Sequence, residues 1–134
     1  MDTRSKILTA AEARQIAGPV ALVTSYFDVL RGECVRELEA FAAKAGGGQS
    51  QAPRLLAAAL PLEGALLEQR ARAELVAGLR VVDYVIAASE GEVEELIEAL
   101  KPLRVARLEA EHIRLSRELR ERVHNRLGKQ APAR

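Results

Sequence analysis

The feature that most constrains the fold is an alternation along the chain between short apolar runs and longer segments with helical spacing. Val20–Ser25 (VALVTS) is a short, continuous apolar run after Gly18-Pro19, which is typical of a buried strand. The next segment carries apolar residues at three- and four-residue intervals, at Cys34, Leu38, Phe41 and Ala45. This spacing predicts an amphipathic helix that packs against a sheet.

The same alternation continues to the end of the chain. Further strands are predicted at Arg54–Leu60, Val81–Ala88 and Leu103–Leu108. Capping-box spacings at Thr9–Glu12 and Ser89–Glu92 each predict the start of a helix, and Leu66–Leu79 has helical apolar spacing. A last helix is predicted from the four-residue spacing of Leu115, Leu119, Val123 and Leu127, with Gly128 as its C-terminal stop. Strands and helices in alternation imply parallel strands joined by right-handed crossovers. We predict an α/β, Rossmann-like three-layer αβα sandwich with a parallel sheet of about four or five strands.

Length and composition favour one domain over residues 1–134, in which 109–134 form an arginine-rich C-terminal helix. A chain of 134 residues, 49% hydrophobic, is long enough to bury a core without disulfides. Its one cysteine excludes a disulfide framework and a zinc site built on several cysteines. The apolar runs are shorter than the ~20 residues that span a bilayer, and the first residues lack a signal-peptide core. We expect a cytoplasmic protein without a membrane partner.

Gly46–Pro53 is the one loop-like stretch.

Charge is divided unevenly along the chain. Residues 1–100 contain 10 basic and 15 acidic residues, a net charge of −5, whereas 101–134 contain 10 basic and 4 acidic residues, a net charge of +6. A basic segment can meet nucleic acid or an acidic partner. Here the arginines alternate with glutamates and no aromatic residue accompanies them, which is typical of a solvated helix face. Nucleic acid is therefore not the favoured partner.

Three blocks of the sequence resemble one family. Phe27–Glu39 (FDVLRGECVRELE), after the first long strand, resembles the signature FDLLHxGHVxxLxxA of the HxGH nucleotidyltransferase superfamily. Arg70–Ile86 (RARAELVAGLRVVDYVI) resembles the RAELVAALxxVDYVV stretch of cytidylyltransferase-like proteins and ADP-heptose synthase adenylyltransferase domains. Leu96–Pro102 (LIEALKP) resembles the part of those proteins that follows, a helix ending in LKP before the next strand. The blocks follow the family's order, and the resemblance covers most of residues 18–108.

This resemblance implies a nucleotide site at the start of the helix after that strand. In the family, two histidines there contact the nucleotide phosphates and stabilise charge as pyrophosphate leaves. The implied nucleotide- or phosphate-binding residues here are Phe27, Asp28, Arg31, Gly32 and Glu33, while Arg31 and Cys34 stand in place of the histidines. ATP or CTP with Mg²⁺ would be the ligands if binding is retained.

The chain departs from the family's pattern in three places. Both histidines are replaced, and Glu33 stands where a glycine lets phosphate approach the backbone. The short, acidic stretch Pro61–Leu66 replaces a longer loop with a basic KGPGRP-like motif. The family's later Ser/Thr-rich motif is absent, and an arginine-rich helix stands there instead. We therefore expect a catalytically degenerate protein that retains at most weak nucleotide or phosphate binding.

Several alternatives stay open at this point. Asp28 is either a remnant of a substrate site or a turn residue. Cys34 is either a reactive thiolate at a helix start or a buried, inert thiol. His112 and His124 are too far apart on one helix to share a metal ion, so no metal site is predicted.

Two other functions also remain open. In the first, the chain is an interaction protein whose C-terminal helix forms a homodimer or binds another partner. Dimers are common in the resembled family, which favours a homodimer. The remaining alternative is an active, atypical nucleotidyltransferase that acts on a sugar phosphate or an alcohol phosphate.

Overall fold

The computed structural model of the chain describes residues 3–28, 30–46 and 52–130, and within the last helix it describes only some of the side chains. The strands are β1 (Ile7–Leu8), β2 (Val20–Ser25), β3 (Arg54–Ala59), β4 (Tyr84–Ala87) and β5 (Arg104–Arg107). The helices are the 3-10 helix η1 (Thr3–Lys6), α1 (Ala10–Ala13), α2 (Gly32–Gly46), α3 (Gln69–Ala77), α4 (Glu90–Leu100) and α5 (Glu109–Gln130).

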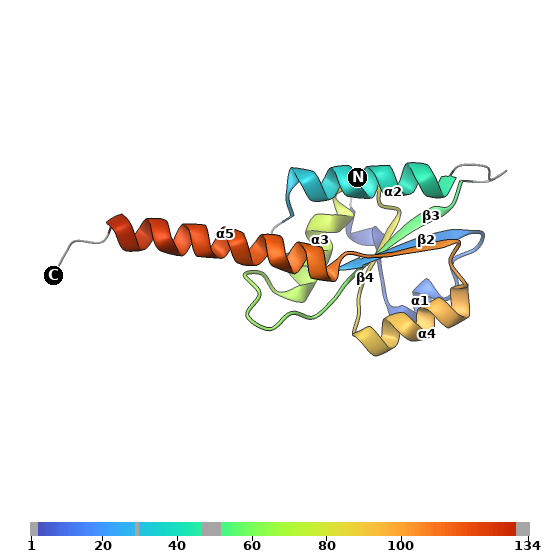
Figure 1. The fold of residues 1–134 in the computed structure, drawn as a ribbon. Helices are drawn as coiled ribbons and strands as arrows, with labels where there is room; N and C mark the ends of the chain where they lie inside the picture. Colours follow the sequence, from blue (N-terminus) through green and yellow to red (C-terminus); the bar gives the residue numbers. More distant parts are fainter. Residues whose placement is uncertain (1–2, 29, 47–51, 131–134) are drawn as a thin grey trace.

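The strands form one parallel sheet in the order β1-β4-β3-β2-β5. In the central pair, Val23 of β2 lies beside Ala57 of β3. Helices α2 and α3 cover one face of the sheet, and α1 and α4 cover the other (Figure 1). The chain thus has the predicted α/β, Rossmann-like three-layer fold.

Alternate side chains of the central strands point into two separate cores. Ala21 and Val23 of β2 pack with α2 and α3, whereas Val20 and Leu22 pack with α1 and α4. All six residues of β2 are buried, because helices cover both faces of the sheet. This double cover explains why the strand reads as a continuous apolar run.

Several local predictions are confirmed. The predicted strand Val20–Ser25 matches β2 residue for residue. Thr9 and Ser89 each accept a hydrogen bond from the backbone of a glutamate three residues on, and that glutamate bonds back, so both capping boxes form. Residues 47–51 of the predicted loop Gly46–Pro53 lie outside the described residues.

Several predicted boundaries are wrong. The strands predicted at Arg54–Leu60 and Leu103–Leu108 span only Arg54–Ala59 and Arg104–Arg107. The helix expected over Leu66–Leu79 spans only Gln69–Ala77, because the backbone N–H groups of Leu66 and Leu67 bond to the side chain of Asp28. The strand expected over Val81–Ala88 spans only Tyr84–Ala87, because Val82 still bonds back to Leu79 in a turn. The last helix does not stop at Gly128 and continues to Gln130.

The outer edge of the sheet at β5 differs from its centre. Three of the four β5 residues are exposed. From the end of β5, α5 continues past the carboxyl ends of the strands, and its far end lies well away from the three layers (Figure 1). Within the described part of the chain, no helix is long and apolar enough to cross a membrane.

Candidate functional site at the carboxyl ends of the strands

The strand order reverses at β2. The chain passes from β2 to β3 and β4 on one side, and β5 pairs with the other side of β2. In open parallel sheets, ligands bind in the crevice beyond the carboxyl ends of the strands at such a point. The predicted segment Phe27–Cys34 follows the carboxyl end of β2, so it lies at this edge.

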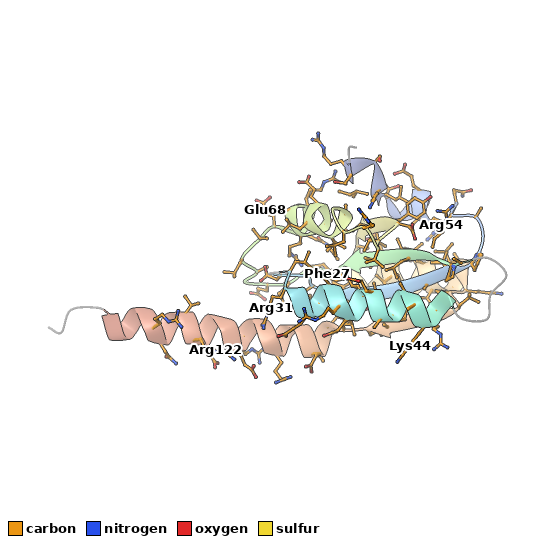
Figure 2. The ribbon with its side chains drawn as sticks, turned by 90° about the horizontal axis from the view of Figure 1, so that it is seen from above. Phe27, Arg31, Lys44, Arg54, Glu68 and Arg122 are labelled. Carbon is orange, nitrogen blue, oxygen red and sulfur yellow. The ribbon has the colours of Figure 1, made fainter. Side chains whose placement is uncertain are left out.

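Phe27 turns the chain out of β2. Its backbone has a φ of 51°, in the left-handed region that residues other than glycine rarely adopt. Its side chain is 2% exposed and belongs to the core beneath α2 (Figure 2). The ring therefore contributes to packing at this edge.

Asp28 binds the loop that precedes α3. Its carboxylate accepts hydrogen bonds from the backbone N–H of Leu66 at 3.0 and 3.1 Å and from that of Leu67 at 3.2 Å. Only 4% of the residue is exposed. Asp28 thus fixes a loop 38 residues further along the chain.

Arg72 lies buried beneath the same loop. Its guanidinium donates to the backbone carbonyls of Tyr26, Leu60 and Leu67, at 2.5, 2.7 and 3.1 Å. Burial lowers the pKa of this guanidinium, and the nearby charge of Asp28 raises it. The arginine therefore joins the carboxyl ends of β2 and β3 to the loop, and Asp28 lies close enough to offset its charge.

Gln69 performs a similar role one turn earlier in α3. Its side-chain amide donates to the carbonyl of Ala59, the last residue of β3, at 2.8 Å and to that of Ala88, just after β4, at 3.2 Å. Together, Gln69 and Arg72 bond to backbone carbonyls at the ends of β2, β3 and β4. On this side of the reversal point, the edge is capped by the chain's own α3.

The residues in place of the family's motif are paired with each other or buried. Arg31, just before α2, contacts Glu33 at 3.4 Å (Figure 2). Both side chains are at the surface, so this ion pair contributes little to stability. Gly32 has no positive φ, and a Cβ there would meet only the end of Arg36 at 3.5 Å. The fold itself does not require a glycine at this position.

Cys34 packs in the core beneath α2 and is 8% exposed. Burial, and then the negative charge of Glu37, raise the pKa of the thiol from 9.0 to about 12. The thiol is therefore protonated at neutral pH, which agrees with the buried, inert alternative.

The other side of the reversal point is open. A cleft of about 290 Å³ lies between the ends of β2 and β5 and the start of α4, and its lining is Thr24, Leu60, Glu90, Gly91, Val93, Glu94, Arg107 and Glu109. Thr24 donates a hydrogen bond to Glu109, and Arg107 pairs with Glu94 at 2.8 Å. The hydrogen bond to Glu94 raises the pKa of Arg107.

The charges of this cleft disfavour a phosphate. Three carboxylates line it, and its one guanidinium is already paired with one of them. A phosphate 4–8 Å from a single carboxylate is repelled by about 2–4 kcal/mol at an effective dielectric constant near 20. Among the described residues, no three His, Cys, Asp or Glu side chains are gathered in a way that could hold a metal ion.

Gln69 and Arg72 were not predicted as residues of this edge. A signal was present, because Arg72 is four residues before the buried Val76 and thus on the inner face of α3. The partners of Arg72 are backbone carbonyls of other segments, which no sequence pattern identifies.

The comparisons with known proteins add no relative: no family model matches the chain, and no curated protein matches it.

Proposed function

We propose that the protein is a cytidylyltransferase-like module with the nucleotidyltransferase fold, that it does not transfer nucleotides at ordinary rates, and that it acts in the cytoplasm. It retains at most weak affinity for ATP or CTP with Mg²⁺. The three sequence blocks and the Rossmann-like sheet support the family assignment. The replaced histidines support the loss of catalysis.

The observation that carries this proposal is the hydrogen bonding of Asp28 and Arg72. These are charged groups at the edge where a nucleotide would bind, and both bond to backbone atoms of the chain. A nucleotide would have to displace those bonds to use either side chain. Each buried group left without a partner would cost about 1–3 kcal/mol.

Calorimetric titration with ATP and with CTP, each with Mg²⁺ at low salt, tests the proposal. We expect half-saturation weaker than about 100 μM, which corresponds to about 5.5 kcal/mol of binding free energy. Tighter, saturable binding would contradict it. Pyrophosphate release in the presence of sugar phosphates or alcohol phosphates would instead support the atypical enzyme.

A second candidate function is protein interaction through α5. The observation that favours it is the position of this helix, whose far end extends beyond the three layers (Figure 1). Val123 near that end is 50% exposed. Of the predicted apolar stripe, Leu115, Leu119 and Leu127 lie outside the described side chains, so Val123 alone represents the stripe here.

A further inference from the structure

The two edges of the sheet are protected differently. At one edge, β1 has only two residues, and Lys6 just before it donates to the carbonyls of Leu79 and Val82 at 3.2 and 3.0 Å. At the other edge, β5 has four residues, and β2 is the one strand that pairs with it in the part of the chain that the structure describes. An edge strand with unpaired N–H and C=O groups is a template for pairing with another chain. The β5 edge is therefore the more open of the two.

Alternate backbone groups of β5 point away from the sheet. Leu103, just before β5, donates its N–H to the carbonyl of Val20 at 2.8 Å. Because N–H groups alternate in direction along a strand, those of Arg104 and Ala106 point away from β2. Among the described residues, none accepts a hydrogen bond from these two N–H groups. Helix α5 continues past the carboxyl end of β5 and does not fold back along this edge (Figure 1). The outward groups of β5 can therefore bond to a further strand.

The side chains of β5 differ in chemistry between the two faces of the sheet. Arg104 lies beside Ala21, whose side chain packs with α2, and Val105 lies beside Leu22, whose side chain packs with α4. Arg104 is thus on the α2 side of the sheet, and Val105 and Leu103 are on the α4 side. Leu103 is 46% exposed and Val105 is 39% exposed. The edge therefore combines an arginine on one face with an apolar strip on the other.

The charge of this segment has one sign. Lys101, Arg104 and Arg107 are all exposed, and no acidic residue lies between positions 98 and 109. Arg107 is paired with Glu94 at 2.8 Å. For Arg104, no ion pair forms among the residues that the structure describes. Arg104 is therefore placed to bind a carboxylate from outside the chain.

We propose that the outer edge of β5 binds an extended acidic segment of another protein as an additional strand. Carboxylates of that segment would lie on the α2 side beside Arg104, and apolar side chains would lie on the α4 side beside Leu103 and Val105. In this mode of recognition, backbone hydrogen bonds supply affinity and alternate side chains supply specificity. The surface is separate from the carboxyl edge and from the far end of α5, so the proposal goes beyond both functions proposed above.

A second copy of this chain does not fit the same edge. It would present an identical basic strand, and like charges on paired strands repel each other. A polyanion such as nucleic acid would satisfy Arg104 but would use neither the outward N–H groups nor the apolar strip. An acidic peptide that alternates with apolar residues matches all three features.

The first test uses a peptide of about seven residues that alternates glutamate and valine, with both ends blocked. Titrated into the whole protein at about 0.1 M salt, it should bind saturably with a dissociation constant of about 100 μM or tighter. The control peptides replace every glutamate with lysine, or every valine with serine, and each should bind at least ~10-fold more weakly. No saturation at about 1 mM glutamate–valine peptide, or equal affinity for the three peptides, would overturn the proposal.

Hydrogen exchange distinguishes an added strand from contact through side chains. At saturation with the glutamate–valine peptide, exchange at the amides of Arg104 and Ala106 should slow at least ~10-fold. Two further peptides are N-methylated at one or the other alternate set of amides. One should lose at least ~10-fold in affinity, and the other should change by less than about 3-fold, because only alternate amides of the added strand face β5. Unchanged exchange, or equal affinity for the two methylated peptides, would overturn the proposal.

Charge reversal assigns the contact to Arg104. Arg104→Glu should bind the glutamate–valine peptide at least ~10-fold more weakly and should gain affinity for the lysine–valine peptide. The matched control is Arg80→Glu, an exposed arginine in the turn before β4, which β3 and β2 separate from β5. The control should change the affinity by less than about 2-fold. Equal weakening in both variants, or duplex DNA that binds through Arg104 in place of the peptide, would overturn the proposal.

Discussion

The carboxyl edge over β2, β3 and β4 and the far half of α5 use similar charged groups in opposite ways. At the edge, Arg72 is buried and bonds to three carbonyls of its own chain. On α5, Arg122 and Arg126 are exposed. The edge uses its charge to hold three segments together, whereas the helix presents its charge to the surroundings. The difference shows that one kind of charged group serves internal hydrogen bonding at the edge and stays at the surface on the helix.

The largest effect is expected from Arg72→Met. One buried and two partly buried carbonyls would lose a charged donor, so the free energy of unfolding should fall by about 3 kcal/mol. Arg70→Met, two residues away, is the matched control, because Arg70 is exposed and pairs with Glu74 on its own helix. The control should change stability by about 0.5 kcal/mol at most. Urea unfolding of both variants measures the difference, and equal effects would contradict the structural role of Arg72.

Asp28→Ala should have the next largest effect. The amides of Leu66 and Leu67 would lose their acceptor, which should cost about 2 kcal/mol and accelerate hydrogen exchange at those two amides. Glu63→Ala, on the same loop but exposed, is the control and should leave both the stability and the exchange rates nearly unchanged. If the exchange of Leu66 and Leu67 is unaffected in Asp28→Ala, then Asp28 does not hold the loop.

Cys34 gives a smaller effect that depends on pH. The native thiol has a pKa raised to about 12, whereas an unfolded thiol ionises near its ordinary value of 9.0. Unfolding therefore releases a proton between these values, and the free energy of unfolding should fall as pH rises through that window. Below pH 9 the thiol is protonated in both states and contributes no pH dependence.

Comparison with Cys34→Ala isolates this effect from that of other groups titrating at high pH. The variant should lose stability less steeply above pH 9. Native Cys34 should also react with a thiol reagent at pH 8 only on the time scale of unfolding. Rapid modification of the folded protein would contradict the buried, protonated thiol.

The smallest effect is expected from Arg31→Ala combined with Glu33→Gly. The ion pair is at the surface, so stability should change by less than about 0.5 kcal/mol. Nucleotide affinity should stay weaker than about 100 μM, because Asp28 and Arg72 remain bonded to the chain. Tight binding in this variant would show that the Arg31–Glu33 pair, and not the bonding of Asp28 and Arg72, excludes the nucleotide.

Sequence patterns predicted the elements that depend on local spacing. The buried strand Val20–Ser25 and the capping box at Ser89 depend on neighbouring residues only, so they were found. Strand β1 was missed, because two residues are too few for any period to emerge. The start of α3 was misplaced, because Asp28 acts on Leu66 from 38 residues away.

The candidate site was predictable in position but not in its bonding. The segment from Phe27 to Cys34 does lie at the carboxyl edge, where a parallel sheet places the segment after its central strand. Asp28 meets the amides of Leu66 and Leu67, and Arg72 becomes buried, only when the loop before α3 folds back over the sheet. Charged residues are seldom fully buried, so composition gives no reason to expect an arginine there.

The most direct measurement is the amide NMR spectrum of the protein during titration with ATP and with CTP, each with Mg²⁺. The amides of Arg31, Gly32, Glu33, Leu66 and Leu67 report on the edge where a nucleotide would bind. If the chain itself occupies this edge, none of these five signals should shift in a saturable way below about 100 μM nucleotide. Saturable shifts confined to these amides at lower concentration would show that the edge still binds nucleotide and would contradict the account.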